Sequence, residues 1–312
     1  MNKGTDAFNY NWMVKYTPQT AWITGKGVYL WLAFFFAEIF AGVYFISIFL
    51  DLRAGLLVGW LGSLLLGGGF HILYLGKADR GWRILFKVER SELSRGLWTI
   101  FFFSAIGFIQ ILPIVFPGLP WSWNALTLKI IMGILSVLVI IHGFMTMSVI
   151  RAVPMWNNSM MIPLSFASGL WVGSQIVGVI LLLMGSYGSM AELWCRWSLF
   201  LLMATLLVYL WGSYHGSDTV KASIKRLFAG DCSLQFYIGV LLIGICVPLI
   251  ITLSFWGSDL SNINAGLVIL RLICVLIGDA TISYVIMKAP LYPPLVLKNN
   301  VIAFFQPAGK YA

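Results

Sequence analysis

The sequence predicts an all-α integral membrane protein with eight transmembrane helices. Its 312 residues are 60% hydrophobic and only 10% charged, with a mean hydropathy of +0.91, whereas soluble domains carry about 25% charged residues. Eight apolar stretches reach the roughly 20 residues that a helix needs to cross a ~30 Å hydrocarbon layer. We expect helices because they satisfy their own backbone hydrogen bonds within lipid.

The eight predicted spans are separated by short segments in which charged and turn-forming residues gather, such as Asp51-Leu52-Arg53. In the fifth span, Gly169 and Gly173 have the spacing that lets two helices approach closely. The predicted spans are Val28–Leu50, Leu56–Tyr74, Leu97–Phe116, Leu126–Ile150, Met161–Met184, Trp197–Tyr214, Tyr237–Phe255 and Ala265–Met287.

Lysine and arginine are distributed unequally between the two sides of these helices. An even number of spans places both termini on one side, and that side holds sixteen cations: Lys3, Lys15, Lys26, Lys77, Arg80, Arg83, Lys87, Arg90, Arg95, Arg151, Lys221, Lys225, Arg226, Lys288, Lys298 and Lys310. The other side holds three, Arg53, Lys129 and Arg196. The positive-inside rule therefore predicts a cytoplasmic terminal side. The first 27 residues lack the apolar core of a cleavable signal peptide, so we expect them to remain as a polar tail.

Five acidic, arginine or histidine residues fall inside the predicted spans. Glu38, Arg271 and Asp279 are charged types, which cost at least ~2.5–3.5 kcal/mol each at mid-depth and therefore suggest function. His71 and His142 lie near the terminal side, and we expect them to approach Glu38 if the first four helices form a bundle. Arg271 and Asp279 are eight residues apart, which is too far for direct pairing, so they line a polar path or pair with other helices. Each of the five could also be a buried side chain that merely satisfies a neighbouring helix.

Metal and haem sites are not expected within the chain. The four cysteines show no CxxC spacing, and iron–sulfur or zinc sites need about four clustered ligands. His71 and His142 form the one histidine pair within the membrane, but their estimated depths differ by about a turn, which argues against axial ligation of a b-haem. The cysteines are Cys195, Cys232, Cys246 and Cys274.

A short polar segment between the second and third spans, residues 71–96, carries six cations. Such a loop is a candidate docking surface for an acidic partner or for lipid phosphates. Positive-inside topology alone would also explain its charge. The six cations are Lys77, Arg80, Arg83, Lys87, Arg90 and Arg95.

Residues 75–83, LGKADRGWR, resemble the LGRPxRxW loop of the polysulfide reductase membrane subunit family (NrfD/PsrC-like). Further segments resemble, in the same order, the SRG that opens this family's third helix, its Y-T-G, PxWN and P…SGL segment, and its LLxG…G…P signature. These segments are Ser94-Arg95-Gly96, His142-Gly143, Pro154 to Asn157, Pro163 with Ser168-Gly169, and Leu227 to Gly230 with Gly244 and Pro248.

The resemblance implies two four-helix bundles, residues 28–153 and 154–287, between a polar N-terminal tail (1–27) and a C-terminal tail (288–312). It also implies a docking loop at 75–96 with a quinone pocket beneath it. His142 takes the place of a quinone-contacting tyrosine, and His71 lies at the entrance of the loop. With Glu38 they are the expected catalytic and quinone-binding residues, and Trp156 is assigned to the same pocket.

The chain departs from the family pattern at three points. Lys77-Ala78 replaces Arg-Pro, which keeps the cation but loses the rigid turn. Histidine at 142 titrates near neutral pH, unlike tyrosine, and is better suited to accept a quinol proton. The family's arginine is absent from the segment that begins at Gly278, and Arg271 is its candidate substitute in a proton path with Asp279.

The function that the resemblance implies is that of a quinone-reacting anchor subunit of a respiratory oxidoreductase in the inner membrane of a prokaryote. It would pass electrons between menaquinone or ubiquinone and an iron–sulfur subunit, beside a molybdopterin-containing catalytic subunit. Membrane lipid is its other expected partner, and no nucleic acid is. Family members with exported catalytic subunits carry the partner outside the cytoplasm, which conflicts with the charge distribution.

Two alternatives stay open. The first is a secondary transporter or ion-translocating protein with Glu38, Arg271 and Asp279 on its substrate path. The second is a quinone-coupled proton pump in which Arg271 and Asp279 line a half-channel from the side with few charges.

Overall fold

The computed structural model describes residues 13–257 and 263–295, and in this part the chain is almost entirely helical. Eight helices are long and apolar enough to cross a membrane, which confirms the predicted all-α membrane fold. Six of the spans are single α-helices, and the first five of these are α1 (Gly27–Phe49), α4 (Glu92–Val115), α5 (Leu126–Ser148), α6 (Met161–Leu183) and α7 (Ser189–Tyr214). The last span is α10 (Ala265–Lys288).

The second and seventh spans contain π-helical segments. The second runs from α2 (Arg53–Gly62) through η2 (Ser63–Gly68) into α3 (Gly69–Tyr74), and the seventh runs from η4 (Gln235–Cys246) into α9 (Val247–Ser254). A π-helical turn contains more residues than an α-helical turn and is frequent at functional sites. Side chains beyond such a segment therefore point in directions that a regular helix does not predict.

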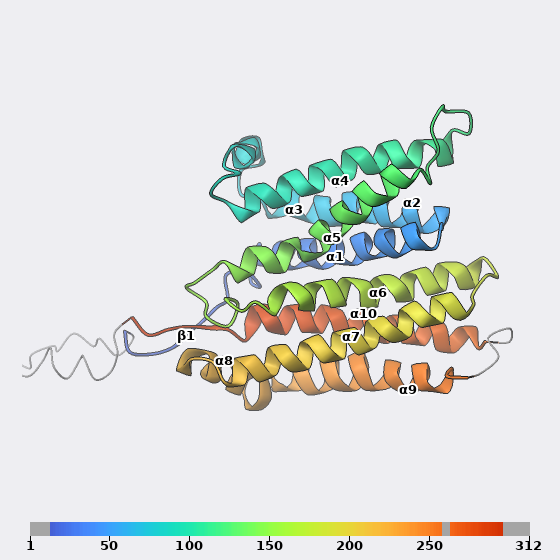
Figure 1. Cartoon of the computed structure of the whole chain (residues 1–312). Coiled ribbons are helices and arrows are strands. Elements are labelled where there is room, and N and C mark those ends of the chain that lie inside the picture. The colour runs from blue at the N-terminus through green and yellow to red at the C-terminus, as the bar shows by residue number, and fades with distance from the viewer. Residues whose placement is uncertain (1–12, 258–262, 296–312) are drawn as a thin grey trace, which may run out of the picture.

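Figure 1 shows the spans lying side by side, with α4 at one edge of the molecule and α9 at the other. α1 and α6 contact each other extensively in the middle of the array. Gly42 on α1 lies so close to Gly169 on α6 that a Cβ atom at residue 42 would overlap the Gly169 carbonyl. Glycine is needed at this crossing because only a residue without a side chain lets the two backbones meet.

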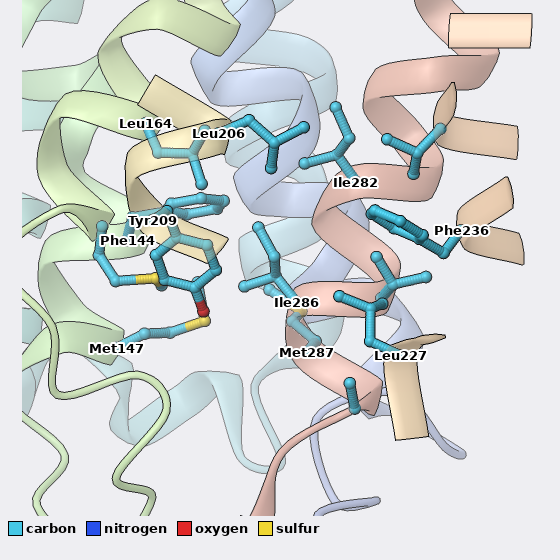
Figure 2. Packing of buried hydrophobic residues seen from close by; sticks show 14 of the residues in the cluster. Phe144, Met147, Leu164, Leu206, Tyr209, Leu227, Phe236, Ile282, Ile286 and Met287 are labelled. Carbon is cyan, nitrogen blue, oxygen red and sulfur yellow. The ribbon is translucent and has the colours of Figure 1, made fainter. Parts of the chain in front are cut away.

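The largest apolar core runs across the boundary between the two halves of the chain. Figure 2 shows Phe144 and Met147 of α5 beside Leu164 of α6 and Tyr209 of α7, with Ile286 of α10 in the same cluster. Phe34 and Ile39 of α1 also belong to it. The first four spans are therefore packed directly against the last four.

Several short elements gather at one end of the spans, where both termini of the described chain lie (Figure 1). They are the strands β1 (Thr17–Pro18) and β2 (Leu291–Tyr292), which pair antiparallel, the 3₁₀-helix η3 (Ala78–Phe86) and the helix α8 (Asp218–Ala229). We call this end the loop face. It is the end that carries most of the cations.

Two spans begin five or more residues earlier than predicted. α4 begins at Glu92, not Leu97, because the Ser91 hydroxyl caps it by accepting a hydrogen bond from the Ser94 amide. α7 begins at Ser189, not Trp197, although the added turns include Glu192 and Arg196. Glu192 is tolerated there because it is paired with a cation from another span, as described below.

Candidate functional site

The structure brings the imidazole rings of His71 and His142 together. Their ring centroids are 6.1 Å apart, and the Phe34 ring makes an edge contact with each, at 5.6 Å from His71 and 5.9 Å from His142. The expected approach of these two histidines is therefore confirmed. η2 directly precedes the helix that carries His71. Its π-helical geometry changes the direction of the following side chains from that expected for a regular α-helix.

The two imidazoles have unused hydrogen-bonding atoms. His71 Nδ1 lies 2.8 Å from the Gly67 carbonyl oxygen, which can only accept, so the proton is on Nδ1 and Nε2 is an acceptor. Nε2 of His71 and both ring nitrogens of His142 have no hydrogen-bond partner among the described residues. Buried polar atoms are normally bonded, so a cluster of three such nitrogens suggests a place where a ligand binds.

His71 also forms the polar wall of an apolar cleft of about 370 Å³ at the loop face. The cleft lies between α3, η3 and α4, and most of its lining is aliphatic. Such a cleft has the size and character of a small-molecule site. Its lining residues include Leu30, Tyr74, Trp82, Leu85 and Ile100.

Three residues assigned to the quinone pocket from the sequence do not line this cleft: His142, Glu38 and Trp156. His142 lies behind His71 and reaches the cleft only through that ring contact. Trp156 is fully buried, donates a 2.7 Å hydrogen bond from Nε1 to the Ile286 carbonyl and packs on Trp22. Its position is that of a core residue joining the loop before α6 to α10.

Glu38 lies with Asp279, not with the histidines. Its Oε2 is 3.2 Å from the Ser165 hydroxyl, and the Asp279 carboxyl is close enough to interact with it electrostatically. Asp279 Oδ1 accepts a hydrogen bond from Ser168. Glu38, Asp279 and the two serines are all buried, so the structure contains a second polar cluster that the sequence did not indicate.

Arg271 forms a third buried cluster, and Asp279 is not among its partners. Its guanidinium donates to both carboxylate oxygens of Glu192, at 3.0 Å and 2.9 Å, and to the Tyr187 and Thr252 hydroxyls. The Tyr187 hydroxyl in turn donates to Glu192 over 2.6 Å. Burial raises the pKa of Tyr187, so the phenol keeps this proton.

Glu192 is the functional candidate that sequence reasoning missed, because the segment before Trp197 was read as a loop. A signal was present in the sequence. AELWCRW has the composition of a helix continuing toward the membrane, and an acid inside a span needs a cation from another span. Arg271 was the one arginine predicted inside a span.

The six predicted docking cations have different environments. Arg95 is held within the loop by Glu92 and by the Val88 and Glu89 carbonyl oxygens. Arg80 pairs loosely with Asp79, and Arg83 lies over the Trp82 ring. The side chains of Lys77, Lys87 and Arg90 are exposed, and so are the nearby aromatic residues Trp82 and Phe86 of η3, at 57% and 76%. The surface of η3 therefore combines positive charge with exposed aromatic rings.

The fold and these clusters define a multi-pass α-helical membrane protein with two histidines beside a cleft at its charged end. In the described part of the chain, no three histidine, cysteine or acidic side chains come together as a metal site would require. The chain matches no protein-family model and no curated protein sequence. Its functional assignment therefore depends on the site itself.

Proposed function

We propose that the chain is the quinone-reacting membrane anchor of a multi-subunit respiratory oxidoreductase. The observation that carries this proposal is the His71–His142 pair. The two rings are in contact, three of their nitrogens have no partner among the described residues, and the His71 ring lines an apolar cleft. The resemblance of residues 75–83 to the loop of the polysulfide reductase membrane subunit family supports the same assignment.

A quinone headgroup fits the chemistry of this cleft. Menaquinone or ubiquinone is a flat apolar ring with two carbonyl groups, and its reduction takes up two protons. The aliphatic walls accommodate the ring, and His71, the imidazole that lines the cleft, has its Nε2 unpaired as an acceptor for a quinol proton. An imidazole nitrogen can both accept and return a proton, which suits a residue that handles quinol protons. His142, in ring contact with His71, is the next group able to take up a proton.

Electrons would leave the site through a partner on the loop face. The exposed surface of η3 adjoins the cleft, because Trp82 is part of that surface and also lines the cleft. We infer that this surface holds an iron–sulfur subunit with an acidic contact region, which is joined in turn to a molybdopterin-containing catalytic subunit. Redox cofactors in those chains would exchange electrons with the quinone below.

We assign the protein to the inner membrane of a prokaryote. We place its partner on the outer side, as in the members of the similar family whose catalytic subunits are exported. The charge distribution favours the opposite orientation. A single reporter cysteine in place of Lys87, in a background that lacks the four native cysteines, distinguishes the two. Labelling of intact cells by a membrane-impermeant maleimide is expected, and labelling only after lysis would reverse the assignment.

The proposal is tested with an azido-quinone that crosslinks on illumination. Labelling is expected in peptides that cover residues 68–100, competed by unlabelled menaquinone and strongly reduced in His71→Ala. His215→Ala is the matched control, because His215 is an exposed histidine at the loop face that bonds only locally to Trp211. Equal labelling of both variants and wild type would exclude the histidine site.

A transporter is the second candidate, favoured by the buried acids at the boundary between the halves. Glu38 and Asp279 lie where α1, α6 and α10 meet, the kind of central position at which transporters bind ions. Purified chain in liposomes that moves a solute without partner subunits would support this reading. Co-purification of an iron–sulfur protein with the chain would support the anchor.

A further inference from the structure

Four oxygen-bearing side chains form a closed cluster at the junction of three spans. Glu38 comes from α1, Ser165 and Ser168 from α6, and Asp279 from α10, and each is at most 5% exposed. The ion pairs found in the described residues join neither carboxyl to a cation. Two neighbouring carboxyl groups in a dry interior cannot both be ionised without a compensating charge.

The hydrogen bonds of Ser165 indicate where a proton is. Its hydroxyl oxygen lies 2.8 Å from the Ile140 carbonyl oxygen and 3.2 Å from Glu38 Oε2. A hydroxyl has one hydrogen to donate, and a carbonyl oxygen can only accept. The shorter contact therefore takes the Ser165 hydrogen, and the hydrogen between Ser165 and Glu38 must belong to Glu38.

The remaining atoms of Glu38 agree with this assignment. Oε1 is buried and has no hydrogen-bond partner in the described part of the chain. An ionised Glu38 would thus have one oxygen without any donor and the other facing a hydroxyl whose hydrogen is used elsewhere. A carboxylate in that position is strongly disfavoured, whereas a neutral carboxylic acid donates to Ser165 and leaves a weakly polar C=O at Oε1.

Asp279 differs in having a donor. The Ser168 hydroxyl donates to its Oδ1, and Ser168 also lies next to the Glu38 carboxyl. Ser168 is therefore placed between a carboxyl that holds a proton and one that can receive it.

We propose that Glu38, Ser168 and Asp279 form a proton-binding site at the junction of α1, α6 and α10, with one exchangeable proton that rests on Glu38. The transfer step is balanced. The Glu38 acid turns its proton from Ser165 to the Ser168 oxygen, Ser168 gives its own hydrogen to Asp279, and one proton has moved while the serine is unchanged. Ser165 keeps Glu38 oriented between transfers.

The site lies close beneath the histidine pair. Phe34 contacts both imidazoles, and Glu38 is one turn further along α1, a rise of about 6 Å. Use of this proton by the histidines rests on the proposed function. The existence of the proton site does not, because it follows from the hydrogen bonds of the cluster.

Infrared spectroscopy of the full chain in lipid tests the site without any quinone. A carbonyl stretch of a protonated carboxylic acid is expected near neutral pH, with a shift to lower frequency in D₂O, and it is expected to disappear in Glu38→Gln. The glutamine amide is neutral and can donate to Ser165 as the acid does, so this variant should fold. Ser165→Ala is the second variant, and it is expected to shift the band by removing its hydrogen-bond acceptor.

Glu192→Gln is the matched control, since Glu192 is buried in a span but is paired with the Arg271 guanidinium. The band should be unchanged in that variant. The proposal is wrong if wild type and Glu38→Gln have the same carbonyl region. It is also wrong if the cluster responds to sodium with a change in its carboxylate bands, because two carboxylates would then share a metal ion. Failure of quinone binding alone would leave the band intact.

Discussion

Gly96 of α4 lies directly against the imidazole ring of His142 on α5, so that a Cβ atom at residue 96 would overlap the ring. The His142 ring is therefore positioned by the absence of a side chain on a neighbouring helix. The same glycine belongs to the Ser94-Arg95-Gly96 segment that opens α4. The first turns of α4, which follow the basic loop, thus pack against the histidine pair.

Gly96→Ala is expected to displace the His142 ring and to destabilise the protein by about 1–3 kcal/mol, the usual cost of overpacking. Azido-quinone labelling of residues 68–100 should fall at the same time. Thermal unfolding in detergent and the labelling assay measure the two effects. Gly133→Ala on α5 is the control, because a Cβ at Gly133 meets nothing within 4 Å. Normal labelling of Gly96→Ala would show that the position of His142 is unimportant for the quinone.

Trp156→Phe is expected to lower stability and to leave quinone binding unchanged. The substitution removes the hydrogen bond to the Ile286 carbonyl, at a cost of about 1–3 kcal/mol for the buried acceptor left without this donor. Trp156 does not line the cleft. The unfolding temperature should therefore fall, while the quinone concentration that half-saturates labelling stays the same. A large rise in that concentration would show that Trp156 contributes to quinone binding.

The fold could be predicted from the sequence because lipid leaves few options. Eight apolar stretches of helical length permit little besides eight spans, and the structure has them at nearly the predicted positions. The close approach at Gly169 could also be expected from the small-residue spacing, although its partner Gly42 could not. The number and approximate ends of the spans can thus be predicted from the sequence, but which spans pack against each other cannot.

The site was predictable only in part, for the same reason. His71 and His142 were expected to approach each other and their rings are in contact, but the π-helical segment η2 that precedes His71 has no clear mark in the sequence. Glu38 was grouped with them from its depth, whereas the contact of α1 with α6 and α10 brings it to Asp279. Arg271 found its partner in Glu192, 79 residues away in the chain.

The Arg226–Asp231 pair at the loop face predicts a dependence of stability on pH. Hydrogen bonds from the Arg226 guanidinium, at 2.9 Å and 2.7 Å, lower the pKa of Asp231. A lowered pKa in the folded state stabilises the fold above the ordinary aspartate pKa of about 3.9, and this contribution is lost as pH falls through the folded-state value. Asp231→Asn should therefore reduce the unfolding temperature at neutral pH, and the difference should shrink at low pH. Asp218→Asn, on an exposed and long ion pair, is the control.

The Glu192–Arg271 pair is expected to stabilise the second half only as a pair. Arg271 is fully buried and Glu192 is 1% exposed, so removing one partner leaves an uncompensated charge in the membrane interior. Arg271→Met and Glu192→Met should each cost about 3–5 kcal/mol, whereas the double variant should recover most of that loss. Unfolding of the four proteins in the same detergent gives the coupling free energy of the pair. Additive losses in the double variant would mean that Tyr187 and Thr252, and not Glu192, provide the main compensation for the guanidinium charge.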